Sequence, residues 1–274
     1  MPFDRAVAGG RVADRLGFAF ASGYDAALHA LIPALAPDTV AGFSVTEEGG
    51  NHPRSIRARL EPAESGYLLS GKKRWSTMGS LADVIVVVAS TGATVEGRPE
   101  LRAVYVHKSA RGLTLTEMPA TAFVPEVPHA ELVLELVPVA PSAVLPGDGY
   151  ADYVKPFRTV EDIHVNGAVL GYLLSVATRN GWPDASLESI VAALASARTI
   201  AALDPRAAET HVALAGLLEQ VARIVEAAEP SWSLVSDTER ERWYRDRVLT
   251  QVAGRARQQR RERALADLRG AEPT

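Results

Sequence analysis

The spacing of apolar residues divides the chain into three stretches of different character. Between residues 11 and 35, apolar positions recur every three or four residues, which is the period of an amphipathic helix. We expect two short helices here, separated at Ser22 and Gly23 and ended by Pro33 and Pro37. Because such short helices cannot bury both faces alone, they must pack against later parts of the chain.

From residue 40 to about 139 the pattern becomes typical of strands. Short apolar runs alternate with glycine and proline, and residues 83–89 form an apolar run of mainly β-branched side chains, as expected for a strand buried on both faces. The predicted strands are 41–46, 55–61, 67–77, 83–89, 101–106, 113–118 and 130–136. Their near-regular spacing favours a compact antiparallel barrel or sandwich.

The last part of the chain is helical. After Pro146 and Gly147 we predict helices at 150–180, 186–202, 207–228 and 238–268, and the third carries an amphipathic apolar stripe. Helices of this length can close a four-helix bundle. The predicted fold class is therefore α+β and multidomain. It has a short N-terminal helical remnant (1–39), a central antiparallel β-barrel or sandwich domain (40–147) and a C-terminal four-helix bundle (148–274).

Composition narrows the chemistry. The 274 residues include no cysteine, which excludes disulfides, thiolate metal sites and cysteine nucleophiles. The formal net charge of -4 does not call for nucleic acid as a partner. No apolar run is long enough for a membrane span and no secretory leader is visible, so we predict a cytoplasmic location away from the membrane. Glu161 and His164 form one E-x-x-H, but di-iron bundles need a second, so no metal is predicted.

Two segments carry a more specific pattern. Residues 43–51 read FSVTEEGGN, and residues 66–77 read GYLLSGKKRWST and precede the β-branched run. In order and spacing they resemble the middle β-domain of the acyl-CoA dehydrogenase family, whose patterns are T-E-P-G and Y-x-L-x-G-x-K-x-W-x-T. The resemblance implies a helical domain, a β-barrel domain and a four-helix bundle, which agrees with the architecture predicted above. It also implies bound flavin adenine dinucleotide (FAD).

By the same resemblance, five residues of the two motifs become candidate flavin ligands. Val45 and Thr46 would offer backbone and hydroxyl groups to the pyrimidine side of the flavin ring. Trp75 would pack on the ring, and Thr77 would hydrogen-bond near its reactive nitrogen, with Ser76 between them. Donors at these places would hold the negative charge that a hydride acceptor develops. The alternative is that Trp75 and the threonines are ordinary strand residues.

The catalytic base is the most selective test of the resemblance. Most members carry a glutamate in a Y-E-G motif, where this chain has Ala253. A minority place the glutamate on the first bundle helix, ten residues before a glycine, and counting back from Gly171 reaches Glu161. Glu161 is therefore the candidate base that removes a proton next to a thioester. The other interpretation is a solvated first-turn glutamate, favoured by the helix dipole.

The sequence thus predicts FAD-dependent α,β-dehydrogenation of an acyl-CoA or similar thioester, in a homodimer or higher homo-oligomer. The alternative is a non-catalytic relative without flavin, acting as a dimerising ligand-binding or scaffold module. Three departures from the family pattern favour that alternative: Ala253 in place of the usual base, the altered phosphate loop in which Glu48 replaces a proline, and the shortness of the helical part before Thr46. Residues 179–182 and 229–232 also replace motifs on the adenine side of the cofactor, which weakens the expected contact there. The arginine-rich last helix is interpreted as a solvated face with i,i+4 ion pairs.

Overall fold

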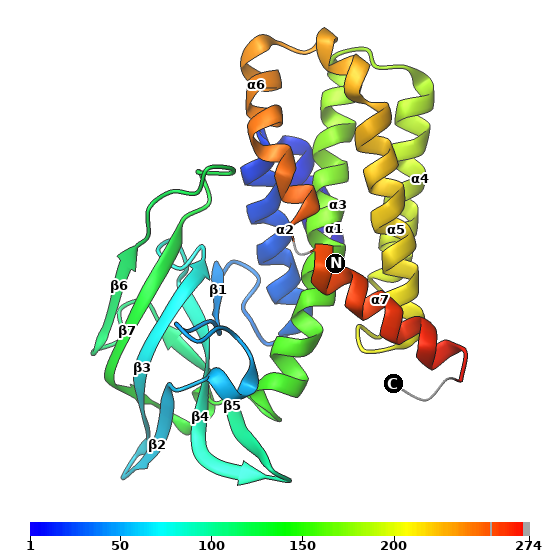
Figure 1. The fold of residues 1–274 in the computed structure, drawn as a ribbon. Coiled ribbons are helices and arrows are strands. Elements are labelled where there is room, and N and C mark those ends of the chain that lie inside the picture. Colours follow the sequence, from blue (N-terminus) through cyan, green and yellow to red (C-terminus); the bar gives the residue numbers. More distant parts are fainter. Residues whose placement is uncertain (253, 271–274) are drawn as a thin grey trace. The chain divides into compact units, whose positions relative to one another are not determined.

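The computed structural model describes residues 1–252 and 254–270, which form two compact units (Figure 1). A helical unit contains residues 1–30, 121–126 and the described residues from 158 onward. A β-unit contains residues 31–120 and 127–157. The predicted class of N-terminal helices, central β-domain and C-terminal helical domain is confirmed.

The β-unit is built on a sheet of seven described strands. These are β1 (Ala41–Ser44), β2 (Arg59–Ala63), β3 (Gly66–Thr77), β4 (Val84–Val95), β5 (Arg98–His107), β6 (Leu113–Glu117) and β7 (His129–Val139). The strand order is β1-β4-β2-β3-β7-β6, and β5 pairs with β4. Short 3-10 turns lie at Pro53–Ser55 and Pro141–Ala143.

The sheet is mixed, whereas the sequence predicted an antiparallel one. β1 runs parallel to β4, with Ala41 opposite Val84 and Ser44 opposite Val87. Hydrogen bonds also join the residues just before these two strands. The Asp83 backbone N–H donates to the Val40 carbonyl at 2.8 Å, and the Val40 N–H donates to the Asp83 carboxylate at 3.2 Å. The remaining pairings are antiparallel apart from one parallel contact between β2 and β4.

The core of the β-unit follows the alternation of each strand. Leu60, Leu69, Ile85, Val87 and Leu132 are all buried and pack in one apolar cluster. β4 has neighbouring strands on both sides, and residues 85–89 are all buried. This confirms the expectation that the β-branched run forms a strand buried on both faces.

The described helices are α1 (Pro2–Val12), α2 (Leu16–Leu31), α3 (Lys155–Arg179), α4 (Asp184–Ile200), α5 (Ala208–Ala227), α6 (Asp237–Asp246) and α7 (Gly254–Leu268), and all but the first residues of α3 and the last residue of α2 belong to the helical unit. A π-turn (Gly149–Val154) precedes α3, and 3-10 turns lie at Glu229–Leu234 and Arg247–Gln251. The predicted last helix is thus split into α6 and α7. Among the described helices, none is both long and apolar enough to cross a bilayer.

The first helical stretch breaks at residues 13–15, not at Ser22 and Gly23 as the sequence predicted. Gly23 lies inside α2, where its missing side chain allows close packing on α3: a Cβ on Gly23 would stand 2.6 Å from Val165 Cα. Glycine in this helix therefore serves a packing contact and not a turn.

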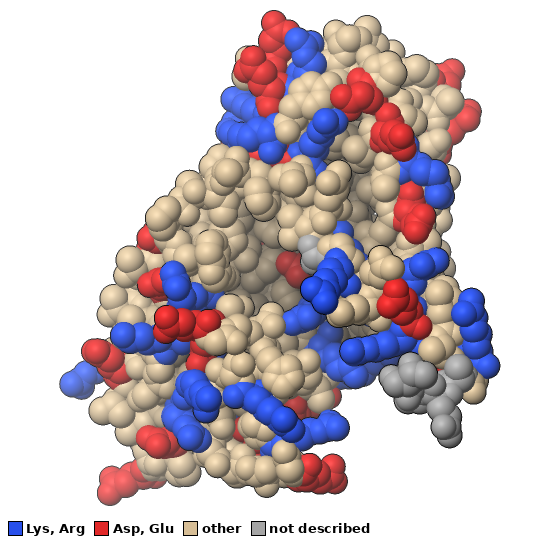
Figure 2. Space-filling model, in the orientation of Figure 1, with Lys and Arg blue, Asp and Glu red and all other residues tan. Residues whose placement is uncertain are grey.

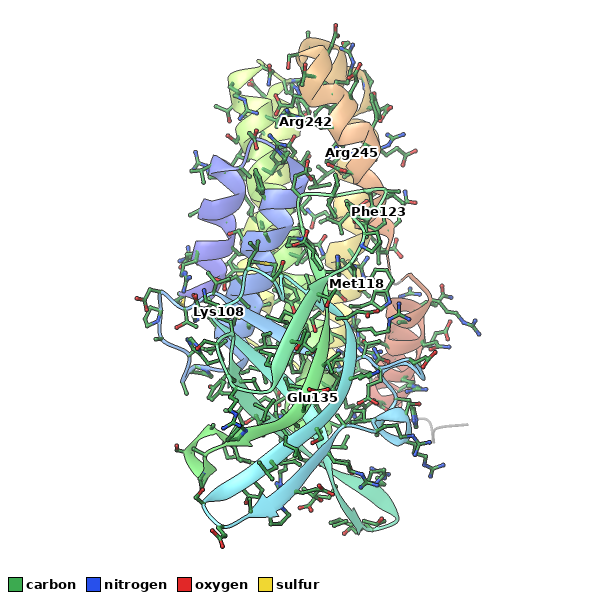
Figure 3. The ribbon with its side chains drawn as sticks, turned by 90° about the vertical axis from the view of Figure 1, so that its left-hand side faces the viewer. Lys108, Met118, Phe123, Glu135, Arg242 and Arg245 are labelled. Carbon is green, nitrogen blue, oxygen red and sulfur yellow. The ribbon has the colours of Figure 1, made fainter. Side chains whose placement is uncertain are left out.

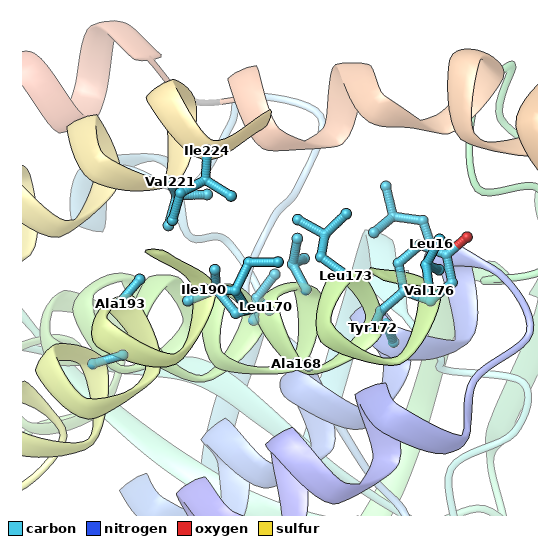
Figure 4. Packing of buried hydrophobic residues seen from close by; sticks show 14 of the residues in the cluster. Leu16, Ala168, Leu170, Tyr172, Leu173, Val176, Ile190, Ala193, Val221 and Ile224 are labelled. Carbon is cyan, nitrogen blue, oxygen red and sulfur yellow. The ribbon is translucent and has the colours of Figure 1, made fainter. Parts of the chain in front are cut away.

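The core of the helical unit lies between α3, α4 and α5, with α1 and α2 on α3 (Figure 4). Leu170, Leu173 and Val176 of α3 are fully buried there, as are Ile190 of α4 and Leu214 of α5. This apolar layer agrees with the amphipathic stripe expected for the third predicted helix, which is α5.

Candidate active site

The flavin-motif residues of the β-unit lie on neighbouring strands. Phe43 of β1 pairs with Thr77 of β3, and the Arg74 backbone N–H donates to the Thr46 carbonyl at 2.8 Å. The hydroxyls of Ser44 and Ser76 hydrogen-bond to each other between the same two strands. The two motifs, about thirty residues apart in sequence, therefore meet in one patch of the β-unit.

A β-bulge aims Trp75 outward from this patch. The register between β3 and β7 shifts between Lys73 and Ser76, and Trp75 adopts a left-handed φ of 58°. Such a conformation is uncommon outside glycine, and bulges often redirect a side chain at a functional site. Trp75 is 50% exposed and its ring meets His129 edge-on at 5.6 Å. Burial lowers the pKa of His129, which favours the neutral form of this histidine.

The two threonines of the patch have free hydroxyls. Thr46 and Thr77 are half-buried, and across residues 1–252 and 254–270 neither hydroxyl hydrogen-bonds to the protein. Ser76 differs, since its side chain is buried and bonded to Ser44. Val45 is also buried, and its carbonyl accepts from Lys73. Thr46 and Thr77 can therefore serve a ligand, while Val45 and Ser76 hold the strands.

A buried ion pair, missed in the sequence, fixes the loop after Thr46. Lys73 Nζ donates to Glu47 Oε1 at 2.7 Å and to the Val45 carbonyl at 3.2 Å. The Glu47 carboxylate also accepts the backbone N–H groups of Arg57 at 2.7 Å and Ala58 at 3.0 Å. Lys73 is 0% exposed, and this burial lowers its pKa against the opposing pull of Glu47. The sequence did offer a signal for this burial. Side chains alternate between the two faces of a strand, so Lys73 lies on the same face of β3 as the buried Leu69.

Glu161 lies in the second turn of α3 and is half-buried. Burial, with a smaller contribution from the negative charge of Asp162, raises its pKa to about 7, and Arg257 and Arg158 oppose the rise. The favourable dipole effect is confined to the first turn of a helix. A carboxyl whose pKa lies near neutrality suits a general base, and such shifts cluster at functional sites.

The neighbouring Asp162 ties α7 to α3. Its carboxylate accepts from Arg257 at 2.7 Å and also pairs with Arg260. Basic side chains gather over α7 with acidic ones among them (Figure 2). The sequence predicted i,i+4 ion pairs for this arginine-rich stretch. Arg257 and Arg260 instead pair with a carboxylate of another helix, α3.

The arginines of α6 also pair with distant elements. Arg245 donates to Glu126 at 2.8 Å, and Arg15 donates to the same carboxylate at 3.3 Å. The buried Asp246 carboxylate accepts the Val124 backbone N–H at 2.7 Å. In Figure 3, the segment with Phe123 lies next to the helix that carries Arg242 and Arg245. Residues 121–126 are therefore fixed within the helical unit by buried charge.

Comparison with known proteins agrees with this geometry. Residues 42–137 match the model of the acyl-CoA dehydrogenase middle domain. Over 141 residues, 51% of this chain, the protein is 28% identical to the probable acyl-CoA dehydrogenase YngJ of Bacillus subtilis. The chain covers only 37% of that relative's length, and it covers less than two thirds of each curated relative it matches.

The middle part of the chain is thus similar to the acyl-CoA dehydrogenase family. Solved structures share its fold. The FAD complex of PigA superimposes with a TM-score of 0.70 at 14% identity, covering 97% of this chain and 82% of that one. The butyryl-CoA dehydrogenase of Megasphaera elsdenii gives a TM-score of 0.65 at 18% identity, covering 92% and 78%.

In this chain, Arg179 and Trp182, which lie where the resemblance expects an adenine-side motif, have partners within the helical unit. Arg179 pairs with Glu239 of α6 and donates to Ser175 at 3.2 Å. Trp182 is 3% exposed and packs edge-on against Trp232 at 5.3 Å. These side chains stabilise the helical unit. Ala253, which replaces the common family base, lies outside the described residues.

The donor set of the β-unit fits the flavin ring. An isoalloxazine offers acceptor atoms at its pyrimidine edge and a flat apolar face, and it needs hydroxyl or N–H donors and an aromatic surface. Thr46 and Thr77 supply free hydroxyls, and Trp75 supplies an exposed indole at a β-bulge. The residues present are therefore compatible with this part of FAD.

Proposed function

We propose that the chain is an FAD-dependent dehydrogenase that introduces an α,β double bond into an acyl-thioester. The observation that carries the proposal is the patch of the β-unit to which Thr46, Trp75 and Thr77 belong. The chain also carries Glu161, whose carboxyl has a pKa of about 7 and can exchange protons near neutral pH. The FAD-bound PigA and the butyryl-CoA dehydrogenase, named for these ligands, share the fold and support the cofactor and the substrate class.

Residues of the β-unit bind the flavin ring, and Glu161 handles the proton. Thr46 and Thr77 donate hydrogen bonds to the flavin ring, and Trp75 packs on its face. When bound, FAD supplies the acceptor for the hydride that leaves the substrate β-carbon. The Glu161 carboxylate takes the proton from the α-carbon, and the same group holds that proton as the neutral acid afterwards. Because burial has raised the pKa of Glu161, its ionised form is a stronger base than an exposed glutamate.

The decisive experiment is anaerobic mixing of the FAD-loaded full chain with butyryl-CoA while the visible flavin absorbance is recorded. Bleaching is expected for the wild type and should fall at least a thousandfold in rate in Glu161→Gln, with flavin still bound. Glu188→Gln, on an exposed position of α4, is the matched control and should bleach like wild type. Wild-type rates in Glu161→Gln would remove this residue from the mechanism.

A non-catalytic role is the second candidate, favoured by the use of Arg179 and Trp182 in internal packing. A chain that retains no FAD would support it. The homo-oligomer and the cytoplasmic location stay predictions, and light scattering after gel filtration would measure the former.

A further inference from the structure

The face of α3 that carries Glu161 becomes buried within two turns of this residue, towards the C-terminal end of the helix. Successive residues of an α-helix turn by about 100°, so His164, Val165 and Ala168 continue the Glu161 face towards the C-terminal end of α3. His164 is 3% exposed, Val165 is 8% exposed and Ala168 is fully buried. This face is therefore covered within one to two turns of the candidate base.

Glycine contacts bring α1 and α2 directly onto the α3 backbone. A Cβ on Gly23 would stand 2.6 Å from Val165 Cα, and one on Gly10 would stand 2.0 Å from the Ala168 carbonyl oxygen. The two covering helices also touch each other, since a Cβ on Gly9 would lie 1.9 Å from Ser22 Oγ. At these glycine contacts, no described side chain separates the backbones, so α1 and α2 pack directly on α3.

Phe3 closes the flank of the same face. Its ring packs edge-on against His164 with the centroids 5.9 Å apart, and a Cβ on Gly167 would lie 2.5 Å from the ring. Phe3 is 5% exposed. An acyl chain that extends from Glu161 along α3 therefore meets either this ring or the backbone of α2.

We infer that the substrate carries a short acyl group, and that Phe3 and the Gly23 contact set this limit. The inference rests on the proposed function, which places the substrate α-carbon at Glu161. Val165 is four residues from Glu161, about 6 Å along the helix axis. An extended chain advances about 1.2 Å per bond, so about five bonds reach the closed end.

Binding of substrate analogues tests the limit without requiring turnover. Calorimetric titration of the FAD-loaded full chain would use S-butyl-, S-octyl- and S-dodecyl-CoA thioethers, which have no carbonyl and cannot be dehydrogenated. Each methylene that enters an apolar pocket strengthens binding, so an open channel gives affinity that rises steadily with length. We expect S-dodecyl-CoA to bind at least tenfold more weakly than S-butyl-CoA. Affinity that rises from butyl to dodecyl would overturn the inference.

Variants assign the limit to Phe3. Phe3→Ala should improve S-octyl-CoA binding at least fivefold relative to S-butyl-CoA, and Phe3→Leu, which keeps an apolar side chain there, should move the ratio less in the same direction. Phe18→Ala is the matched control, because Phe18 is 46% exposed on α2. If folded Phe3 variants keep the wild-type ratio within twofold, Phe3 does not set the limit.

The same measurements separate this inference from the proposed function. If the chain binds short thioethers preferentially but no acyl-CoA bleaches it, the limit on acyl length stands and the dehydrogenase activity is refuted. If butyryl-CoA and dodecanoyl-CoA bleach it equally well, the activity stands and the limit on acyl length is refuted.

Discussion

Replacing Lys73 by Met should strongly destabilise the β-unit. The substitution keeps the length of the side chain and removes the only charge that pairs with Glu47 among the described residues. Glu47, which is 8% exposed, would then be an uncompensated buried carboxylate that keeps two backbone N–H donors. Breaking a buried ion pair by removing one partner costs about 3–5 kcal/mol. We expect a loss at the lower end of this range, because the two N–H groups remain.

Hydrogen exchange followed by mass spectrometry would measure this loss in peptides covering 41–63 and 66–77. Lys72→Met is the control, since Lys72 is the exposed neighbour on β3 and should change stability by at most about 0.5 kcal/mol. Adding Glu47→Gln to Lys73→Met should recover part of the loss, because the neutral amide oxygen can still accept from Arg57 and Ala58. Equal exchange in the Lys72 and Lys73 variants would refute the reasoning.

Three further predictions concern the helical unit. Glu161 has a folded pKa of about 7 against about 4.5 when exposed, so the wild type should lose stability as pH rises from 4.5 through 7, by at most about 3 kcal/mol. Urea midpoints for wild type and Glu161→Gln at pH 5 and 8.5 would check this, and a wild-type pH slope in the variant would contradict it. Gly23→Ala should lower the free energy of unfolding by about 1–3 kcal/mol, because the added methyl group clashes with α3. Gly216→Ala should raise it by about 0.5–1 kcal/mol, because Gly216 has open space at an exposed site of α5. If both variants shift the melting temperature alike, the packing argument is wrong. Asp162→Asn should release α7 and speed tryptic cleavage at its arginines, and cleavage at the wild-type rate would show that the ion pairs with Arg257 and Arg260 do not hold this helix.

Much of the fold could be predicted from apolar spacing. The strands and the bundle helices α3 to α5 form close to the predicted ranges, because each carries enough side chains of one period to define its buried face. Spacing does not encode which strands become neighbours. The parallel pairing of β1 and β4 is accompanied by mutual hydrogen bonds of Asp83 and Val40, which a periodicity argument cannot predict.

The errors arose where tertiary contacts override local preference. Gly23 was interpreted as a helix break, yet it is a contact point between two helices. The arginines of the last stretch were assigned to i,i+4 pairs, whereas Arg257 and Arg260 bind Asp162, about a hundred residues away. Lys73 lay in a quoted motif, but its role required knowing that the buried Glu47 faces it. The proposed flavin ligands came from the family resemblance, because isolated threonines in strands carry no signal of their own.

Flavin binding is the central claim. The full chain, purified and incubated with excess FAD, would be passed through gel filtration, and the visible spectrum of the protein peak would be recorded for wild type and for the double variant Thr46→Val/Thr77→Val. We expect flavin bands that co-elute with the wild type and weaker retention in the variant, since the two free hydroxyls are lost. A wild-type peak without flavin absorbance would contradict the account.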